Sequence, residues 1–160
     1  MKPIQVKFKK LNPNATIPKP ATPFAGAMDV TCTEIIVEDG YVRCLTGFST
    51  EIPEGYRIIC AARSSITKTG WMLANGIGIV DSDFRGQWEF RFAPIPTKVA
   101  FGTFLGAKEF PYKVGDRVGQ IFIEKIINME FVETQYLSDT ERSSGGFGST
   151  GNSNLEKVVG

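Results

Sequence analysis

Short apolar runs separated by turn residues recur along this chain of 160 residues and limit the folds open to it. Apolar and polar residues alternate at residues 4–8 and 87–92, which is the period of a half-buried β-strand. A turn signal such as Glu-Asp-Gly at residues 38–40 separates neighbouring runs. No long segment has the 3.6-residue period of a helix; residues 64–68 predict one helical turn, with a serine as N-cap and Gly70 as its end. The sequence therefore predicts an all-β sandwich or barrel.

The composition excludes several classes of function. The chain contains no histidine, and its 18 Lys and Arg nearly balance its 17 Asp and Glu. A serine-hydrolase triad and the common zinc sites use histidine, so a general base here has to be a carboxylate, lysine, tyrosine or cysteine. The balanced charge argues against a general binder of nucleic acid or membrane surfaces. No signal-peptide or membrane-spanning run is present, so we expect a soluble, intracellular, cytoplasmic protein.

The three cysteines, Cys32, Cys44 and Cys60, each lie within an apolar, strand-like run. An odd number without Cys-x-x-Cys spacing predicts neither a disulfide framework nor a metal clamp. We expect three buried thiols in a reducing compartment.

The character of the chain changes towards its C-terminus. Residues 127–132 are apolar enough to lead into a last strand, whereas residues 143–154 contain almost no core-forming side chains. The sequence predicts one β-domain over residues 1–137 and a flexible C-terminal tail over residues 138–160.

Residues 74–88 hold the most distinctive polar cluster. An apolar run with two glycines ends in Asp-Ser-Asp-Phe-Arg-Gly at residues 81–86, which predicts a central hairpin of two strands joined by a bend that carries carboxylates. The spacing is like the start of a calcium loop, but Arg85 and Phe92 stand where that loop needs Asp or Asn and Glu. Two interpretations stay open: a plain turn, or a carboxylate base beside an aromatic ring.

Two further clusters suit phosphate groups. Arg63, Ser64 and Ser65 follow a predicted strand and offer a guanidinium fork, hydroxyls and helix-start amides, although a solvated corner with a serine cap explains them too. In residues 142–151, Phe147 lies between glycines and hydroxyl residues and is suited to stack on a flat base. The alternative for this segment is a plain disordered tail.

Five short segments in fixed order resemble the motifs of the trimeric deoxyuridine triphosphate nucleotidohydrolases (dUTPases). They are residues 26–30 (Gly-Ala-Met-Asp-Val), 63–65, 75–86, 115–120 (Gly-Asp-Arg-Val-Gly-Gln) and 142–151. The resemblance implies an all-β, distorted jelly-roll or β-barrel fold with one short helix. It also implies a homotrimer whose active sites are each built from three chains, with the tail of one subunit closing over a site.

The resemblance implies hydrolysis of dUTP to dUMP and pyrophosphate by water attack on the α-phosphorus, with Mg2+ on the triphosphate. Asp81 would be the base that orients and deprotonates the water, and Gln120 would hold that water and the α-phosphate. Asp29 would reach the hydrated Mg2+ through water molecules, which suits a cation that keeps several of them. Such an enzyme would keep uracil out of DNA and supply dUMP for dTMP synthesis.

The resemblance also assigns contacts to the substrate. The hairpin backbone would read the uracil edge and exclude the methyl group of thymine, and an aromatic ring would pack on the deoxyribose and exclude a 2′-hydroxyl. The implied substrate-binding residues are Arg63, Ser64, Ser65, Asn75, Gly76, Gly78, Phe84, Arg142, Phe147, Gly148, Ser149 and Thr150.

The sequence departs from the family pattern at three places. Phe84 replaces the commoner tyrosine, Ala27 replaces a glycine, and residues 99–110 form a longer segment that we expect to be a surface extension. The related dCTP deaminases need a glutamate near the position of Arg91, for which Glu89 is a candidate. The complete fifth segment favours dUTP hydrolysis over that alternative, and a nucleotide-sensing role stays open as an addition to it.

Overall fold

The structure is a computed structural model that describes residues 3–96 and 109–146. The chain divides into two units, Met1–Ile127 and Asn128–Gly160, called here the strand unit and the C-terminal segment. All strands of the described part belong to the strand unit, as does a single 3-10 helix, so the predicted all-β class is confirmed. The C-terminal segment forms no helix or strand over residues 128–146.

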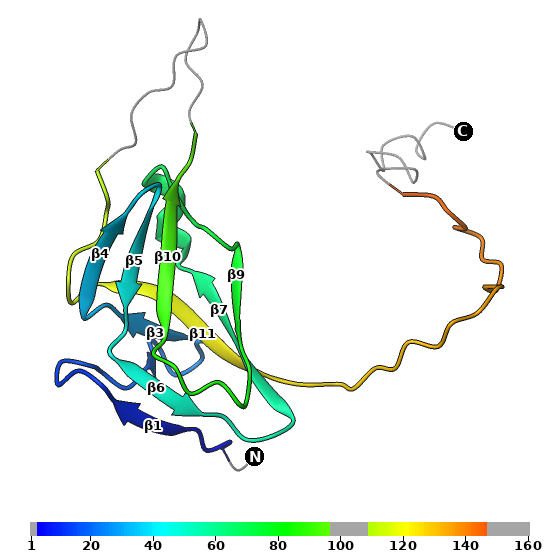
Figure 1. Cartoon of the computed structure of the whole chain (residues 1–160), viewed down its shortest axis with the longest axis horizontal. Helices are drawn as coiled ribbons and strands as arrows, with labels where there is room; N and C mark the ends of the chain where they lie inside the picture. Colours follow the sequence, from blue (N-terminus) through cyan, green and yellow to red (C-terminus); the bar gives the residue numbers. More distant parts are fainter. Residues whose placement is uncertain (1–2, 97–108, 147–160) are drawn as a thin grey trace, which may run out of the picture. The chain divides into compact units, whose positions relative to one another are not determined.

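The strands pair antiparallel into three sheets (Figure 1). In the two-stranded sheet, β1 (Lys7–Lys10) pairs with β6 (Phe48–Glu51). The four-stranded sheet has the order β4 (Glu34–Glu38), β5 (Tyr41–Leu45), β10 (Glu89–Pro94) and β8 (Trp71–Leu73). The five-stranded sheet has the order β2 (Lys19–Pro20), β3 (Met28–Thr31), β11 (Arg117–Lys125), β7 (Tyr56–Ala62) and β9 (Ile77–Val80). The 3-10 helix η1 (Ser64–Lys68) follows β7 directly.

Several local predictions are confirmed. Strands β4 and β5 form a hairpin whose turn places Gly40 at φ 83°, a conformation that glycine adopts without strain. The apolar side chains that alternate along β10 and just before it are buried: Trp88, Phe90 and Phe92 are only 3%, 2% and 0% exposed. Alternation therefore identified the core-facing side of this strand correctly.

Apolar residues from the four-stranded and five-stranded sheets form one core. Phe90 and Phe92 of β10 and Val118 and Ile121 of β11 belong to the same buried cluster. Between the two sheets, a Cβ atom built on Gly119 would lie 2.1 Å from Cε1 of Phe90. The sheets approach so closely here that no larger residue fits beside the phenylalanine ring.

The cysteines are buried and carry free thiols, as predicted. Burial raises the pKa of Cys60 to about 12, so its thiol stays protonated and unreactive at neutral pH. The Cys32 Sγ donates to the carbonyl oxygen of Glu34 at 3.0 Å, which satisfies it within the core.

Three sequence predictions are wrong in detail. Strands β9 and β10 do not pair as a hairpin; β9 pairs with β7 and β10 with β5 and β8, so the polar bend crosses between two sheets. The helical turn over residues 64–68 exists, but Arg63 occupies its N-cap position and makes no side-chain cap hydrogen bond. The last strand expected to follow residues 127–132 is absent from the described part of the chain, where β11 is the final strand and ends at Lys125.

The predicted surface extension at residues 99–110 lies mostly outside the described residues. Phe110, which is described, packs against Trp71 and Phe92 with ring centroids 5.0 and 5.9 Å apart. No helix of the described residues is both long and apolar enough to cross a membrane.

We predict that Gly119→Ala lowers the free energy of unfolding by about 1–3 kcal/mol, because the added methyl group forces the Phe90 ring aside in a packed core. Urea denaturation at fixed protein concentration measures the change. Gly26→Ala is the matched control, since a Cβ there meets no atom within 4 Å. Equal stability of the two variants would contradict the close approach of the sheets.

Candidate active site

The outer face of the five-stranded sheet carries a row of side chains that faces away from the core. The register places Lys19 opposite Asp29, Asp29 opposite Gln120, Gln120 opposite Ala61, and Ala61 opposite Ile77. Residues directly opposite each other project to the same face of a sheet. Two of the sequence-predicted site residues, Asp29 and Gln120, therefore lie side by side.

Asp29 in β3 is held by two arginines. Its Oδ1 accepts a hydrogen bond from Nε of Arg63 at 3.1 Å, and its Oδ2 accepts one from Nη1 of Arg117 at 2.8 Å. The Arg63 Nη1 also donates to the carbonyl oxygen of Arg117 at 3.3 Å. The Asp29 side chain is 16% exposed, so these partly buried pairs orient both guanidinium groups while leaving further N–H groups for an anion.

The neighbouring polar groups continue this cluster towards η1. Gln120 Nε2 donates to the carbonyl oxygen of Ala62 at 3.1 Å, which fixes its amide beside the start of the helix. Ser64 and Ser65 are exposed there. Burial raises the pKa of the Tyr112 hydroxyl, and nearby Arg63 and Ser65 oppose this shift. We call Asp29, Arg63, Ser64, Ser65 and Gln120 the phosphate half-site, after the chemistry that its donors suit.

No group of three or more Asp, Glu, Cys or His side chains that could hold a metal occurs in the described part of the chain. Both carboxylate oxygens of Asp29 already accept hydrogen bonds from arginines. A cation near Asp29 is therefore better served through its own water molecules than by direct coordination.

The polar bend after β9 is a second cluster. The Phe84 side chain is 44% exposed, and its backbone amide donates to the carbonyl oxygen of Asp81 at 3.2 Å. A Cβ on Gly86 would lie 2.5 Å from Cζ of Phe84, so the ring lies directly over this glycine. Arg85 Nη1 donates to the carbonyl oxygens of Ser82 and Phe84 at 2.6 and 3.0 Å, which ties the bend together.

A tight turn precedes β9. Gly76 has φ 68°, a left-handed conformation that favours glycine, and its amide donates to the carbonyl oxygen of Leu73 at 3.0 Å. The amide of Ile77 donates to the carbonyl oxygen of Asn75 at 2.7 Å. A Cβ on Gly78 would lie 3.5 Å from Nδ2 of Asn75, so the amide side chain leans over this glycine. We call Asn75, Gly76, Gly78, Asp81 and Phe84 the base half-site, after the nucleobase whose recognition the resemblance assigns to this backbone.

The structure does not bring the two proposed catalytic residues together within one chain. Ile77 is two strands away from Gln120 in register, and Asp81 lies four residues further along from Ile77. With about 3.3 Å per residue and about 4.8 Å between strands, the Cα atoms of Asp81 and Gln120 are ~16 Å apart. A shared water has to be within about 3 Å of each side chain, so one chain holds two incomplete half-sites.

The tail residues are largely outside the described part. Arg142 is exposed, and its Nε donates to the carbonyl oxygen of Gly145 at 2.9 Å. The remaining predicted tail contacts lie outside the described residues: Phe147, Gly148, Ser149 and Thr150.

The sequence of this chain is similar to known proteins over a range that includes both half-sites. The family model for dUTPase matches residues 13–151, a range that contains all five segments. A deoxyuridine 5'-triphosphate nucleotidohydrolase of Wolinella succinogenes is 35% identical over 96% of this chain and 98% of its own length. The chain belongs to the dUTPase family. A Helicobacter pylori protein of the same name is 36% identical over 92% of this chain and 97% of its own.

Solved structures of the family share the fold. The dUTPase of Staphylococcus bacteriophage 80alpha with dUPNHPP has a TM-score of 0.75 and 21% identity, covering 92% of this chain and 99% of that one. A dUTPase of phage phi11 of S. aureus, described with a structural Mg(II) ion, has a TM-score of 0.66 and 16% identity, with 84% and 99% coverage.

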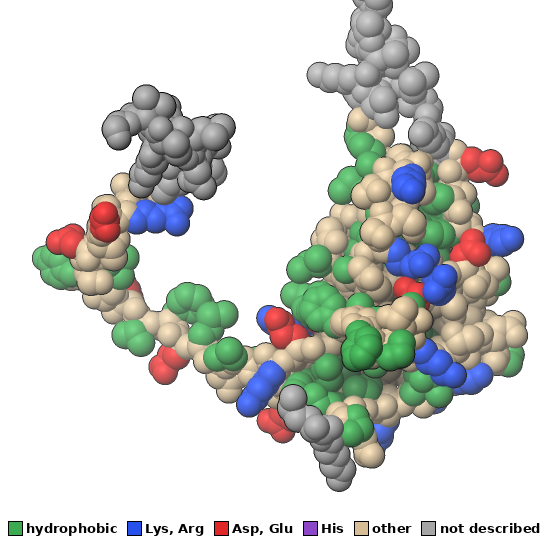
Figure 2. Space-filling model, turned by 180° about the vertical axis from the view of Figure 1, so that it is seen from behind, with side chains coloured by type: hydrophobic (Ala, Val, Ile, Leu, Met, Phe, Trp, Pro, Cys, Tyr) green, Lys and Arg blue, Asp and Glu red, His purple; other side chains and the backbone are tan. Residues whose placement is uncertain are grey.

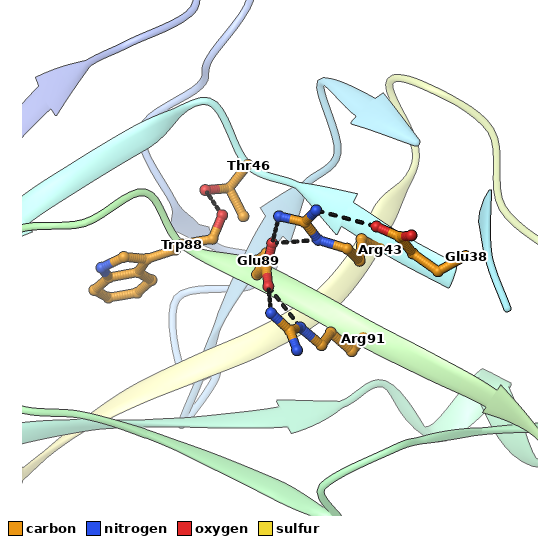
Figure 3. A network of polar contacts seen from close by, with 6 residues as sticks. All are labelled: Glu38, Arg43, Thr46, Trp88, Glu89 and Arg91. Atoms are coloured by element: carbon orange, nitrogen blue, oxygen red, sulfur yellow. Dashed lines mark hydrogen bonds and ion pairs between the residues drawn. The ribbon is translucent and has the colours of Figure 1, made fainter. Parts of the chain in front are cut away.

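The deaminase alternative is not favoured by the surroundings of Glu89. Figure 3 shows the Glu89 carboxylate between Arg43 and Arg91: Oε2 accepts from Arg43 Nη2 at 2.7 Å, and Oε1 accepts from Arg91 Nε at 2.6 Å. Arg43 also donates to Glu38 at 3.3 Å. Burial alone would raise the pKa of Glu89, but the two arginines outweigh it and the net pKa is lowered. A carboxylate held in this way is a poor general base.

Sequence reasoning assigned no role to Arg117, although it lies in a quoted segment. On a regular strand Arg117 and Gln120, three residues apart, would project to opposite faces. A register shift between Arg117 and Gly119 in the pairing with β3 breaks this alternation and lets Arg117 reach Asp29. A bulge has no reliable sequence signal, so the contact was not predictable.

We predict that Glu89→Gln flattens the acid side of the stability curve. Partners that lower the pKa of Glu89 stabilise the fold above the ordinary glutamate pKa of about 4.3, and that stabilisation is lost as pH falls through the lowered value. Thermal unfolding between about pH 6 and pH 3 measures this.

The wild type should lose more stability than Glu89→Gln over this range. Met72→Leu on the same exposed sheet face is the control that keeps the charges and should follow the wild type. Parallel curves for wild type and Glu89→Gln would contradict the stabilising role of the arginine pair.

Proposed function

We propose that the two half-sites divide the hydrolysis of dUTP between them. As a member of the dUTPase family, the chain is a dUTP diphosphatase, which converts dUTP to dUMP and pyrophosphate. The observation that carries this conclusion is the family match across residues 13–151, which includes both half-sites. The reaction limits the dUTP available for incorporation into DNA and supplies dUMP for dTMP synthesis, and we place it in the cytoplasm.

In this proposal Asp81 is the general base. It orients a water molecule, takes its proton and also contacts the 3′-hydroxyl of the sugar, while the oxygen of the water attacks the α-phosphorus and pyrophosphate leaves. Gln120 holds the same water and the α-phosphate. A carboxylate in this role agrees with a chain that contains no histidine.

Specificity for the nucleoside comes from the base half-site. The backbone around Asn75, Gly76 and Gly78 pairs with the uracil edge, and the methyl group of thymine would clash with this hairpin backbone. The Phe84 ring packs on the deoxyribose where a 2′-hydroxyl would clash. The position of this ring over Gly86 supports the role, because the absence of a side chain at Gly86 lets the ring pack against the backbone in one place.

The phosphate chain is bound by the phosphate half-site and by the tail. Arg63, Ser64 and Ser65 bind phosphate oxygens, and the hydrogen bond that Arg63 donates to Asp29 keeps the guanidinium fork in one orientation. From the tail, Phe147 stacks on uracil, and Arg142, Gly148, Ser149 and Thr150 close over the γ-phosphate. Positioning and charge stabilisation are most of what phosphoryl chemistry requires.

Mg2+ is the proposed cofactor. When bound to the triphosphate it neutralises charge on the phosphate oxygens. Asp29 would support it indirectly through water, which agrees with a carboxylate whose oxygens are occupied by Arg63 and Arg117.

The proposed working form is a homotrimer with shared active sites. The separation of ~16 Å between Asp81 and Gln120 supports it, because only a second copy can bring a base half-site onto a phosphate half-site. Figure 2 shows apolar side chains spaced along the C-terminal segment, and Met129 and Phe131 are 80% and 91% exposed. An apolar cavity of about 470 Å³ on the strand unit is lined in part by the exposed side chains of Ile17 and Met28. Assembly would cover such surfaces.

The first test is an assay of pyrophosphate release. With Mg2+ present, we expect the wild type to act on dUTP and far less on UTP, dTTP or dCTP, and Asp81→Asn to lower kcat by about 100-fold or more. Asp83→Asn in the same bend is the matched control and keeps most of the activity. An unchanged rate for Asp81→Asn would show that Asp81 is not the general base. Release of ammonia from dCTP would instead support the dCTP deaminase alternative.

The second test asks whether half-sites from different copies combine. Asp81→Asn and Gln120→Ala are each inactive alone, but their co-assembly returns intact half-sites to some interfaces. When the two variants mix at random in equal amounts, about one half of the sites receive an intact Asp81, and about one half of these also receive an intact Gln120 from another chain. About a quarter of wild-type activity therefore returns. The control mixes each variant with itself. No recovery in verified mixed oligomers would contradict a shared site.

A further inference from the structure

A basic cleft lies beside the phosphate half-site, on the side of β2 and β3. Its volume is about 550 Å³. Asp29 in its lining also belongs to the phosphate half-site, whereas its two lysines have no role in the proposed mechanism. Its polar lining consists of Lys10, Thr16, Lys19, Asp29, Thr31 and Arg117.

The charge of this cleft is unbalanced. Three cationic side chains face one carboxylate, and that carboxylate, Asp29, is already bonded to Arg63 and Arg117. The Lys10 ammonium donates to the carbonyl oxygen of Pro13 at a long 3.3 Å. The Lys19 side chain forms no hydrogen bond or ion pair with any described residue. Two ammonium groups thus keep donors for an anion.

The hydroxyls of the cleft add to this set. Thr16 Oγ1 and Thr31 Oγ1 are 2.5 Å apart, so one of them donates to the other and the second keeps its proton for another acceptor. The arrangement offers hydroxyl, ammonium and guanidinium donors around one space. This combination suits phosphate oxygens.

The cleft is continuous with the phosphate half-site. Lys19 lies opposite Asp29, and Asp29 lies opposite Gln120, so the three side chains follow one row on the outer face of the sheet. Two strand spacings separate Lys19 from Gln120, which is ~10 Å between Cα atoms. An anion that leaves the phosphate half-site in this direction therefore meets Lys19 next.

We propose that this cleft binds pyrophosphate, the diphosphate anion that the reaction releases; this assignment rests on the proposed function. Among the described residues no aromatic side chain lines the cleft, so this lining offers no stacking surface for a nucleobase and suits a free diphosphate better than a nucleotide. Its three cationic side chains, Lys10, Lys19 and Arg117, offer several N–H donors to an anion with two phosphate groups. Lys10 and Lys19 receive the leaving group after the bond to the α-phosphorus has broken.

The test is calorimetric titration of the purified full-length protein with sodium pyrophosphate, without nucleotide, at about 0.15 M salt. Lys10→Ala with Lys19→Ala should weaken binding by about tenfold or more, because charge-assisted hydrogen bonds are lost. The matched control is Lys9→Ala with Lys125→Ala. It removes the same charge from exposed positions outside the cleft and should bind as the wild type does.

Each outcome decides the proposal. Equal binding by the wild type and the cleft variant overturns it, as does an equal loss in the control variant, which would indicate a general charge effect. Orthophosphate binding as tightly as pyrophosphate overturns the diphosphate assignment. Because no nucleotide is present, lysine-dependent pyrophosphate binding by a protein that fails to hydrolyse dUTP would reject the proposed function and retain the cleft.

Discussion

Strand β11 is paired along both edges, with β3 on one side and β7 on the other, and its register decides what reaches each face of the sheet. Alternation turns Gly119 and Ile121 to the core and Gln120 outward. The bulge then brings Arg117 to Asp29 as well. Core packing and the phosphate half-site therefore depend on one pairing. A slip of one residue would bury Gln120 and expose Ile121.

Much of the fold was predictable because local alternation and turn chemistry agree with the tertiary structure. The β4–β5 hairpin, the buried face of Phe90 and Phe92, and the free cysteines all follow from patterns within a few residues. The pairing of β9 was not predictable in this way. Its neighbour in the sheet is β7, and the choice between β7 and β10 is made by contacts distant in sequence.

The site shows the same division. The residue types at Arg63, Ser64 and Ser65 indicated phosphate chemistry, and the family resemblance added Asp29 and Gln120. The structure places Asp29 in contact with Arg63 and opposite Gln120. The sequence-based prediction that residues 127–132 lead into a last strand failed because alternation specifies only that one face is to be buried. It does not say which surface covers that face, and Met129 and Phe131 remain exposed in the single chain.

The ~16 Å between Asp81 and Gln120 has a consequence for how output depends on the amount of enzyme. If each complete site needs more than one chain, diluting the protein removes sites as well as molecules. The turnover rate per chain then falls near the concentration at which copies separate, and the total rate rises more steeply than linearly with protein concentration. In that concentration range, a change in the expression level of the protein would change the total rate of nucleotide hydrolysis by a larger factor.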